Sequence, residues 1–131
     1  MLNSQMAAAY KNQQIMTASP EQLTLLLYNG ALRFLTESIQ ALEEQDIMRS
    51  HNANLRVQAI VREFILTLDM NYELSKDWAA LYDYVENCLI QGNIKKDVAQ
   101  LQNAKTILED MRNTWQEAMK LARQEKISTA R

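Results

Sequence analysis

The 131-residue sequence is poor in residues that interrupt regular secondary structure, with only two glycines and one proline. These residues supply most tight turns, so their scarcity favours long helices over strands. The chain has about the length of one domain. Hydrophobic residues make up 47% and charged residues 23%, which is the balance typical of a globular protein with a core of its own.

The sequence also has little of the chemistry that enzymes use, since it contains one histidine and one cysteine. Zinc sites built from several such ligands are excluded by count, and so are the paired Glu-x-x-His motifs of di-iron bundles. No glycine-rich phosphate loop or nucleophile elbow occurs. We expect no catalytic residue, metal or cofactor, and we interpret Cys88 as a small buried hydrophobe.

Several locations and partners are disfavoured by what is missing. The net charge of −2 does not provide the basic field that nucleic-acid binding needs. No apolar run approaches the roughly 20 residues of a membrane span, and the N-terminus lacks the features of a signal peptide. A lone cysteine cannot form an internal disulfide, which fits a reducing compartment. We therefore expect a cytoplasmic protein with no membrane insertion.

Capping signals divide the apolar pattern into four helices. Ser19 is a good N-cap, Pro20 suits the first helical position, and Gln22 completes a capping box. Asp46 and Asp97 are the N-caps expected for the second and fourth helices. The expected helices cover residues 20–42, 47–68, 75–91 and 98–122.

The end of the third helix is predicted at Gln91-Gly92-Asn93, because glycine is common just past a helix C-terminus. Four helices joined by short links indicate an all-α fold, an antiparallel up-down four-helix bundle with an N-terminal extension. The sequence thus divides into an N-terminal segment (1–18), the bundle (19–122) and a frayed polar tail (123–131).

The first helix has more apolar surface than a bundle core requires, arranged in two rows about 120° apart. The first row is Leu23, Leu26, Leu27, Gly30, Ala31 and Phe34. The second row is Leu25, Tyr28, Leu32, Leu35 and Ile39. One core-facing stripe needs about 100°, so we assign the first row to the core and treat the second row as surplus.

The second helix shows the same pattern more weakly, with a main apolar face and a thin second row that includes Met48, Leu55 and Leu66. Four explanations of the second rows remain open. Neighbouring helices of the bundle could touch the first helix on two sides, so that these residues belong to the core. The N-terminal segment could cover them, a partner helix could dock on them, or a second copy of the chain could form a homodimer seam.

Short motifs distributed over nearly the whole chain resemble one known family. They are Thr17-Ala18-Ser19-Pro20-Glu21-Gln22-Leu23, Leu27-Tyr28-Asn29-Gly30-Ala31, Leu81-Tyr82-Asp83-Tyr84, Asn93-Ile94 and Trp115. In this order and spacing, the sequence closely resembles the flagellin-specific secretion chaperone family, FliS.

The resemblance implies a four-helix bundle that binds the disordered C-terminal segment of flagellin in the bacterial cytoplasm. It also implies that the protein blocks premature polymerisation and brings flagellin to the type III export apparatus, with the cytoplasmic domain of the export gate as a further candidate partner. In that family an N-terminal segment with a tyrosine folds over part of the flagellin site, and Ala9-Tyr10 occupies that place here. A helical adaptor that sequesters another partner, such as a flagellar regulator, is the alternative.

The candidate partner-binding residues come from three places: the N-terminal segment, the second row of the first helix, and the thin row of the second helix. They are Tyr10, Ile15, Met16, Leu25, Tyr28, Leu32, Met48, Leu55 and Leu66.

Overall fold

The computed structural model describes the backbone of residues 2–129 and the side chains of residues 5–9, 11–13 and 16–128. It contains five helices in sequence order: α1 (Leu2–Thr17), α2 (Pro20–Glu43), α3 (Ile47–Thr67), α4 (Ser75–Lys95) and α5 (Val98–Thr129). No strand occurs over residues 2–129. The expected all-α fold class is confirmed.

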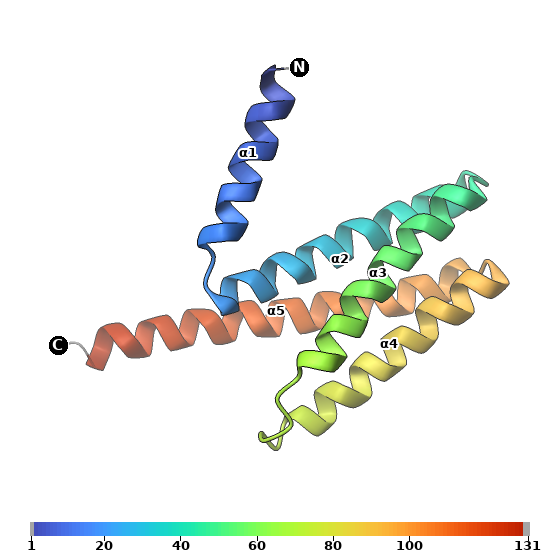
Figure 1. Ribbon diagram of the computed structural model, residues 1–131. Coiled ribbons are helices and arrows are strands. Elements are labelled where there is room, and N and C mark those ends of the chain that lie inside the picture. Colours follow the sequence, from blue (N-terminus) through green and yellow to red (C-terminus); the bar gives the residue numbers. More distant parts are fainter. Residues whose placement is uncertain (1, 130–131) are drawn as a thin grey trace.

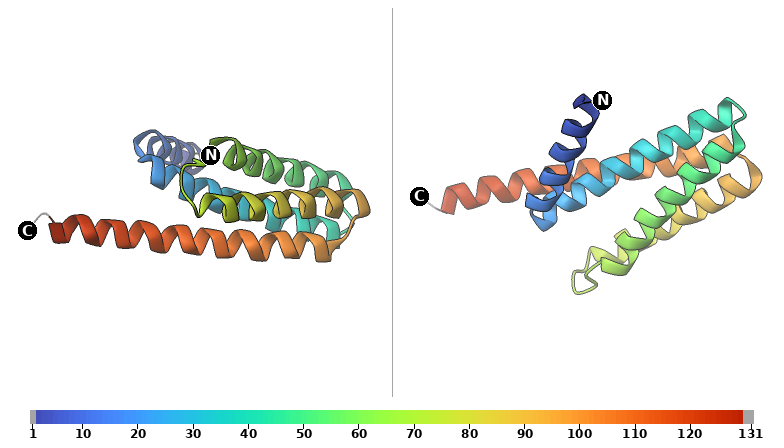
Figure 2. Two further views of the ribbon diagram at one scale, coloured as in Figure 1. Left: turned by 90° about the horizontal axis from the view of Figure 1, so that it is seen from below. Right: turned by 45° about the horizontal axis from the view of Figure 1, so that its top comes forward.

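Helices α2 to α5 form an antiparallel bundle in which each helix packs against two others. Helix α2 packs against α3 and α5, and α4 packs against the same two helices. The α3–α4 pair crosses the α2–α5 pair at an angle (Figures 1 and 2). The two pairs therefore diverge toward the end of the bundle at which α2 and α4 begin.

Two segments extend beyond this bundle. Helix α1 projects away from the start of α2 (Figure 1), and all its described side chains are exposed. Helix α5 continues to Thr129, past the boundary expected at Ala122, with exposed side chains over residues 120–128. That residues 123–131 fray in solution stays a prediction.

The helix starts follow the capping signals in the sequence. The N–H of Gln22 donates to Ser19 Oγ at 3.2 Å, and the Ser19 N–H donates to Gln22 Oε1 at 3.0 Å. The Asp46 carboxylate accepts from the Arg49 N–H at the start of α3. Asp97 Oδ1 accepts a backbone hydrogen bond at the start of α5. Each cap satisfies N–H groups that the first helical turn leaves without partners.

The predicted end of the third helix is wrong, because α4 continues through Gly92 to Lys95. The left-handed residue that ends it is Lys96, with φ of 53°, and the N–H groups of Lys96 and Asp97 both donate to the Gly92 carbonyl oxygen. A Cβ on Gly92 would lie 2.7 Å from Leu101 Cδ2. This glycine therefore allows α4 and α5 to approach closely.

The assignment of the two rows on α2 is also wrong, because the second row faces the core. Tyr28 and Leu35 are fully buried, and Leu32 and Ile39 are 7% and 5% exposed. Of the first row only Ala31 is fully buried, whereas Leu23 is 38% exposed and Leu26, Leu27, Gly30 and Phe34 are half-buried. Helix α2 packs between α3 and α5, and its row between these neighbours becomes the core row.

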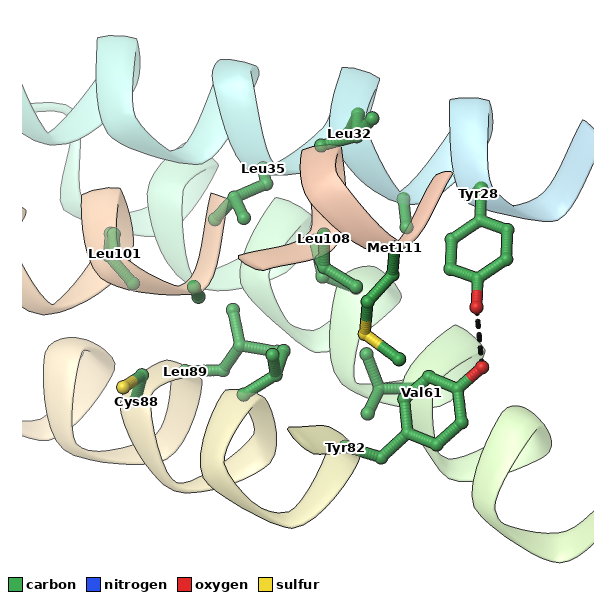
Figure 3. Close-up of a cluster of buried hydrophobic side chains, with 14 of the residues drawn as sticks. Tyr28, Leu32, Leu35, Val61, Tyr82, Cys88, Leu89, Leu101, Leu108 and Met111 are labelled. Carbon is green, nitrogen blue, oxygen red and sulfur yellow. Dashed lines mark hydrogen bonds between the residues drawn. The ribbon is translucent and has the colours of Figure 1, made fainter. Parts of the chain in front are cut away.

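The other helices pack as their patterns predict. In α3 the expected core residues Ala53, Val57, Val61 and Phe64 are buried, and α5 contributes Leu101, Ala104, Leu108 and Met111. Figure 3 shows part of this core, with Leu89 from α4 pointing toward Leu35 and Leu108. Cys88 is 1% exposed and belongs to the same core, as interpreted from the sequence.

Candidate functional site: an apolar cavity and the α2–α3 face

An open cavity of about 430 Å³ lies where the two helix pairs diverge. All four bundle helices and the α3–α4 connection contribute to its mostly apolar lining. The largest side chains of that lining are Tyr28, Phe64, Leu68, Tyr72, Leu74, Trp78, Tyr82 and Trp115. The divergence of the helix pairs leaves this end of the core without filling side chains, so it is open to an apolar group from outside.

Two tyrosines join the helix pairs beside the cavity. The hydroxyl oxygens of Tyr28 on α2 and Tyr82 on α4 are 2.5 Å apart and hydrogen-bonded (Figure 3). The Phe64 ring packs against both, with centroids 4.5 Å from Tyr28 and 5.5 Å from Tyr82. Burial raises the pKa of both phenols above the ordinary value. The pair therefore stays neutral at physiological pH and holds the cavity wall in one arrangement.

Trp115 connects the cavity to the start of α2. Its indole N–H donates to the backbone carbonyl of Glu21 at 3.0 Å. That carbonyl lies in the first turn of α2, 94 residues away in sequence. The bond fixes the orientation of the half-buried indole, which lines the cavity from α5.

A second apolar surface lies on the outside of the bundle, and we call it the α2–α3 face. It consists of Leu23, Leu26, Leu27, Gly30 and Phe34 from α2, with Ile60 and Arg56 from α3. The Cβ position of Gly30 lies 3.9 Å from Ile60 Cδ1, and Arg56 Cζ lies 5.2 Å from the Phe34 ring centroid. The leucines share this side because residues three and four apart lie on one face of a helix.

The structure separates the nine candidate residues into groups. Tyr28 and Leu32 are buried, so their prediction as surface contacts is wrong, although Tyr28 lines the cavity. Leu25 is half-buried on the side of α2 that faces α5.

The remaining candidate residues either lie on the surface or have side chains outside the described residues. Met48, Leu55 and Leu66 point outward from α3, and they are 69%, 45% and 73% exposed. Met16 on α1 is 85% exposed. The side chains of Tyr10 and Ile15 lie outside the described residues.

The cavity residues Trp78, Leu74 and Tyr72 were absent from the candidate residues. Trp78 matched the core stripe of its helix, so periodicity alone gave no reason to single it out. Leu74 and Tyr72 lie in an irregular connection and are 61% and 68% exposed. Two large apolar side chains in an exposed loop were the available signal, because such loops are usually polar.

The one histidine of the sequence takes part in a contact between two helices. His51 Nδ1 lies 2.9 Å from Asn93 Nδ2, which joins α3 to α4. Within the described residues no three His, Cys, Asp or Glu side chains are grouped so that they could hold a metal ion. Over residues 2–129 none of the helices combines the length and apolar character that a membrane span requires. The cavity and the α2–α3 face can therefore bury apolar surface of a ligand.

The fold and the site define a class of protein, the all-helical bundles with an open apolar cavity. Comparison with known families specifies it further. The family described as flagellar protein FliS matches residues 2–122, so the chain belongs to the FliS family. This is a family of chaperones and not of enzymes.

Individual relatives cover most of the chain. The flagellar secretion chaperone FliS of Bacillus subtilis is 37% identical over 118 residues, covering 90% of this chain and 89% of the relative. The Campylobacter jejuni protein of the same name is 27% identical, covering 89% and 93%. That of Salmonella typhimurium is 26% identical, covering 79% and 78%. The family resemblance seen in the sequence is confirmed.

Proposed function

We propose that this protein is a cytoplasmic export chaperone for flagellin. It binds the disordered C-terminal segment of flagellin, prevents premature polymerisation and delivers flagellin to the flagellar type III export apparatus. The observation that carries the proposal is the open apolar cavity beside the α2–α3 face, in a chain whose relatives are named flagellar secretion chaperones.

The energetics of binding a disordered segment favour an extended contact. Ordering such a segment costs a few kcal/mol, so the contact must bury on the order of 1,000–3,000 Å². The cavity alone accommodates only a few side chains. Together with the α2–α3 face and the exposed Leu55 and Leu66 of α3, it offers a surface that one segment can cover while wrapping around the bundle.

The N-terminal segment remains part of the proposal. Met16 is exposed on α1, and Tyr10, Ile15 and Met16 are proposed to contact the cargo or to cover its site when cargo is absent. A homodimer formed without cargo, and contact with the cytoplasmic domain of the export gate, are proposed on the family resemblance alone.

Co-expression with full-length flagellin tests the proposal. We expect the two proteins to co-elute in size-exclusion chromatography, and the complex to disappear when the C-terminal segment of flagellin is deleted. Flagellin with its N-terminal segment deleted is the matched control and should still co-elute. Co-elution that survives the C-terminal deletion would contradict the proposed site, and no co-elution would favour an adaptor for another helical partner.

A further inference from the structure

Two arginine side chains lie against the ring of Phe34 on the α2–α3 face. Arg33 Cζ lies 5.1 Å from the Phe34 ring centroid, and Arg56 Cζ lies 5.2 Å from the same centroid. The sum of these distances, about 10 Å, is the upper limit on the separation of the two guanidinium carbons. Two helices thus place a guanidinium group each against the same Phe34 ring.

Neither arginine forms an ion pair within the described part of the chain. The ion pairs among the described residues involve Arg49, which contacts acidic residues around the α2–α3 turn, and Arg62, which contacts Glu86 on α4. Within those residues Arg33 and Arg56 have no carboxylate oxygen within 4.0 Å. Arg33 also lines a surface cavity with Lys105, Glu109 and Arg112 of α5, so charges of both signs lie on that side of it.

Gly30 lies one helical turn before Phe34 on the same face. A Cβ at this position would meet only Ile60 Cδ1 at 3.9 Å, an ordinary contact distance. Packing within the bundle therefore does not require glycine here, although glycine destabilises a helix interior relative to alanine. A missing side chain on an exposed helix face leaves room for the backbone of a second helix to come close.

We infer that Arg33 and Arg56 together bind one carboxylate side chain of the partner segment, whose helix lies over Gly30 on the α2–α3 face. The inference rests on the proposed function and specifies its cargo contact. Four residues separate Gly30 from Phe34, or about 6 Å along the helix axis. The bound Asp or Glu therefore lies about one turn from an apolar residue that packs over Gly30.

The chemistry of the two side chains fits this role. Guanidinium groups donate paired hydrogen bonds to a carboxylate, and charged partners strengthen these bonds. Contact with the Phe34 ring restrains both arginines, so less side-chain freedom is lost when the carboxylate binds. The neighbouring leucines exclude water from one side of the contact.

Titration calorimetry with a peptide of the flagellin C-terminal segment tests the inference. Arg33→Gln and Arg56→Gln should each weaken binding about fivefold, and the double variant more than about tenfold. Arg62→Gln removes a charge from the other flank of α3 and is the matched control, expected to bind within about twofold of the wild type. Far-UV circular dichroism of each variant checks that the bundle is intact.

Neutralising each acidic residue of the peptide in turn identifies the carboxylate. One such peptide should bind the wild type more weakly and yet bind the Arg33→Gln/Arg56→Gln variant as well as the unmodified peptide does. Binding to the double variant equal to that of Arg62→Gln would overturn the inference and leave the proposed function intact. Absence of binding to the wild type would overturn both.

Discussion

Single residues on α2 decide which of its two leucine-rich rows becomes the core. Both rows recur with the period of a helix, so periodicity alone does not choose between them. The buried row carries Tyr28, whose hydroxyl bonds across the bundle to Tyr82, and Leu32, which packs beside α5. The other row carries Gly30, which gives no side chain to a core. The two rows therefore differ in the side chains that they bring to a core.

A charge placed on each row tests this assignment. Leu35→Glu places a carboxylate in the fully buried apolar core, so we expect it to lower the free energy of unfolding by more than about 4 kcal/mol. Leu23→Glu changes an exposed residue of the first row and should alter the free energy of unfolding by less than about 0.5 kcal/mol. Urea denaturation of both variants measures the difference, and equal stability of the two would refute the assignment.

Replacing each of the two glycines by alanine should change the free energy of unfolding in opposite directions. Gly30→Ala should raise the free energy of unfolding by about 1 kcal/mol, because a Cβ fits there and alanine favours the helix. Gly92→Ala should lower it by about 1–3 kcal/mol, because the new Cβ overlaps Leu101. Thermal unfolding of the two variants provides the comparison, and a stabilising Gly92→Ala would contradict the close α4–α5 contact.

The buried tyrosine pair should make the fold sensitive to alkali. Burial raises the pKa of Tyr28 and Tyr82, so the folded state retains protons that the unfolded state loses near pH 10. The resulting stability is present below about pH 10 and is lost progressively as the pH rises above it. Tyr28→Phe/Tyr82→Phe should lose less stability between about pH 8 and about pH 11 than the wild type does in urea titrations. An equal loss would assign the alkaline effect to other groups.

At the scale of helices, local signals in the sequence predicted the starts better than the ends. Ser19, Asp46 and Asp97 act through hydrogen bonds with the next few residues, so the sequence is sufficient to place them. The end of α4 is instead formed by Lys96, a left-handed residue other than glycine, and Gly92 serves a close contact with Leu101 that exists only after α5 has packed. The cavity could not be predicted for the same reason, because it results from the angle between helix pairs.

Helix α1 should contribute little to the stability of the bundle. Its described side chains are exposed, so deletion of residues 1–17 should change the melting temperature by less than about 2 °C. Deletion through residue 22 also removes the Ser19 cap, worth about 1 kcal/mol, and should lower the melting temperature by about 4–8 °C. A large loss from the shorter deletion would show that α1 packs on the bundle in solution.

At the scale of the whole molecule, apolar surface remains accessible after the core is complete. The cavity, the α2–α3 face and the exposed residues of α3 all involve α2 or α3. The sequence indicated this excess in its first half, although it exchanged the two rows of α2. An unfilled cavity beside an exposed apolar face fits a protein whose folded state is completed by a partner.

Calorimetric titration of the wild type with the flagellin C-terminal segment tests this account most directly. We predict saturable binding with one segment per chain and a negative heat-capacity change, because binding buries apolar surface. A peptide of equal length and composition in scrambled order is the control and should not bind. Absence of saturable binding, or equal binding of the scrambled peptide, would contradict the account.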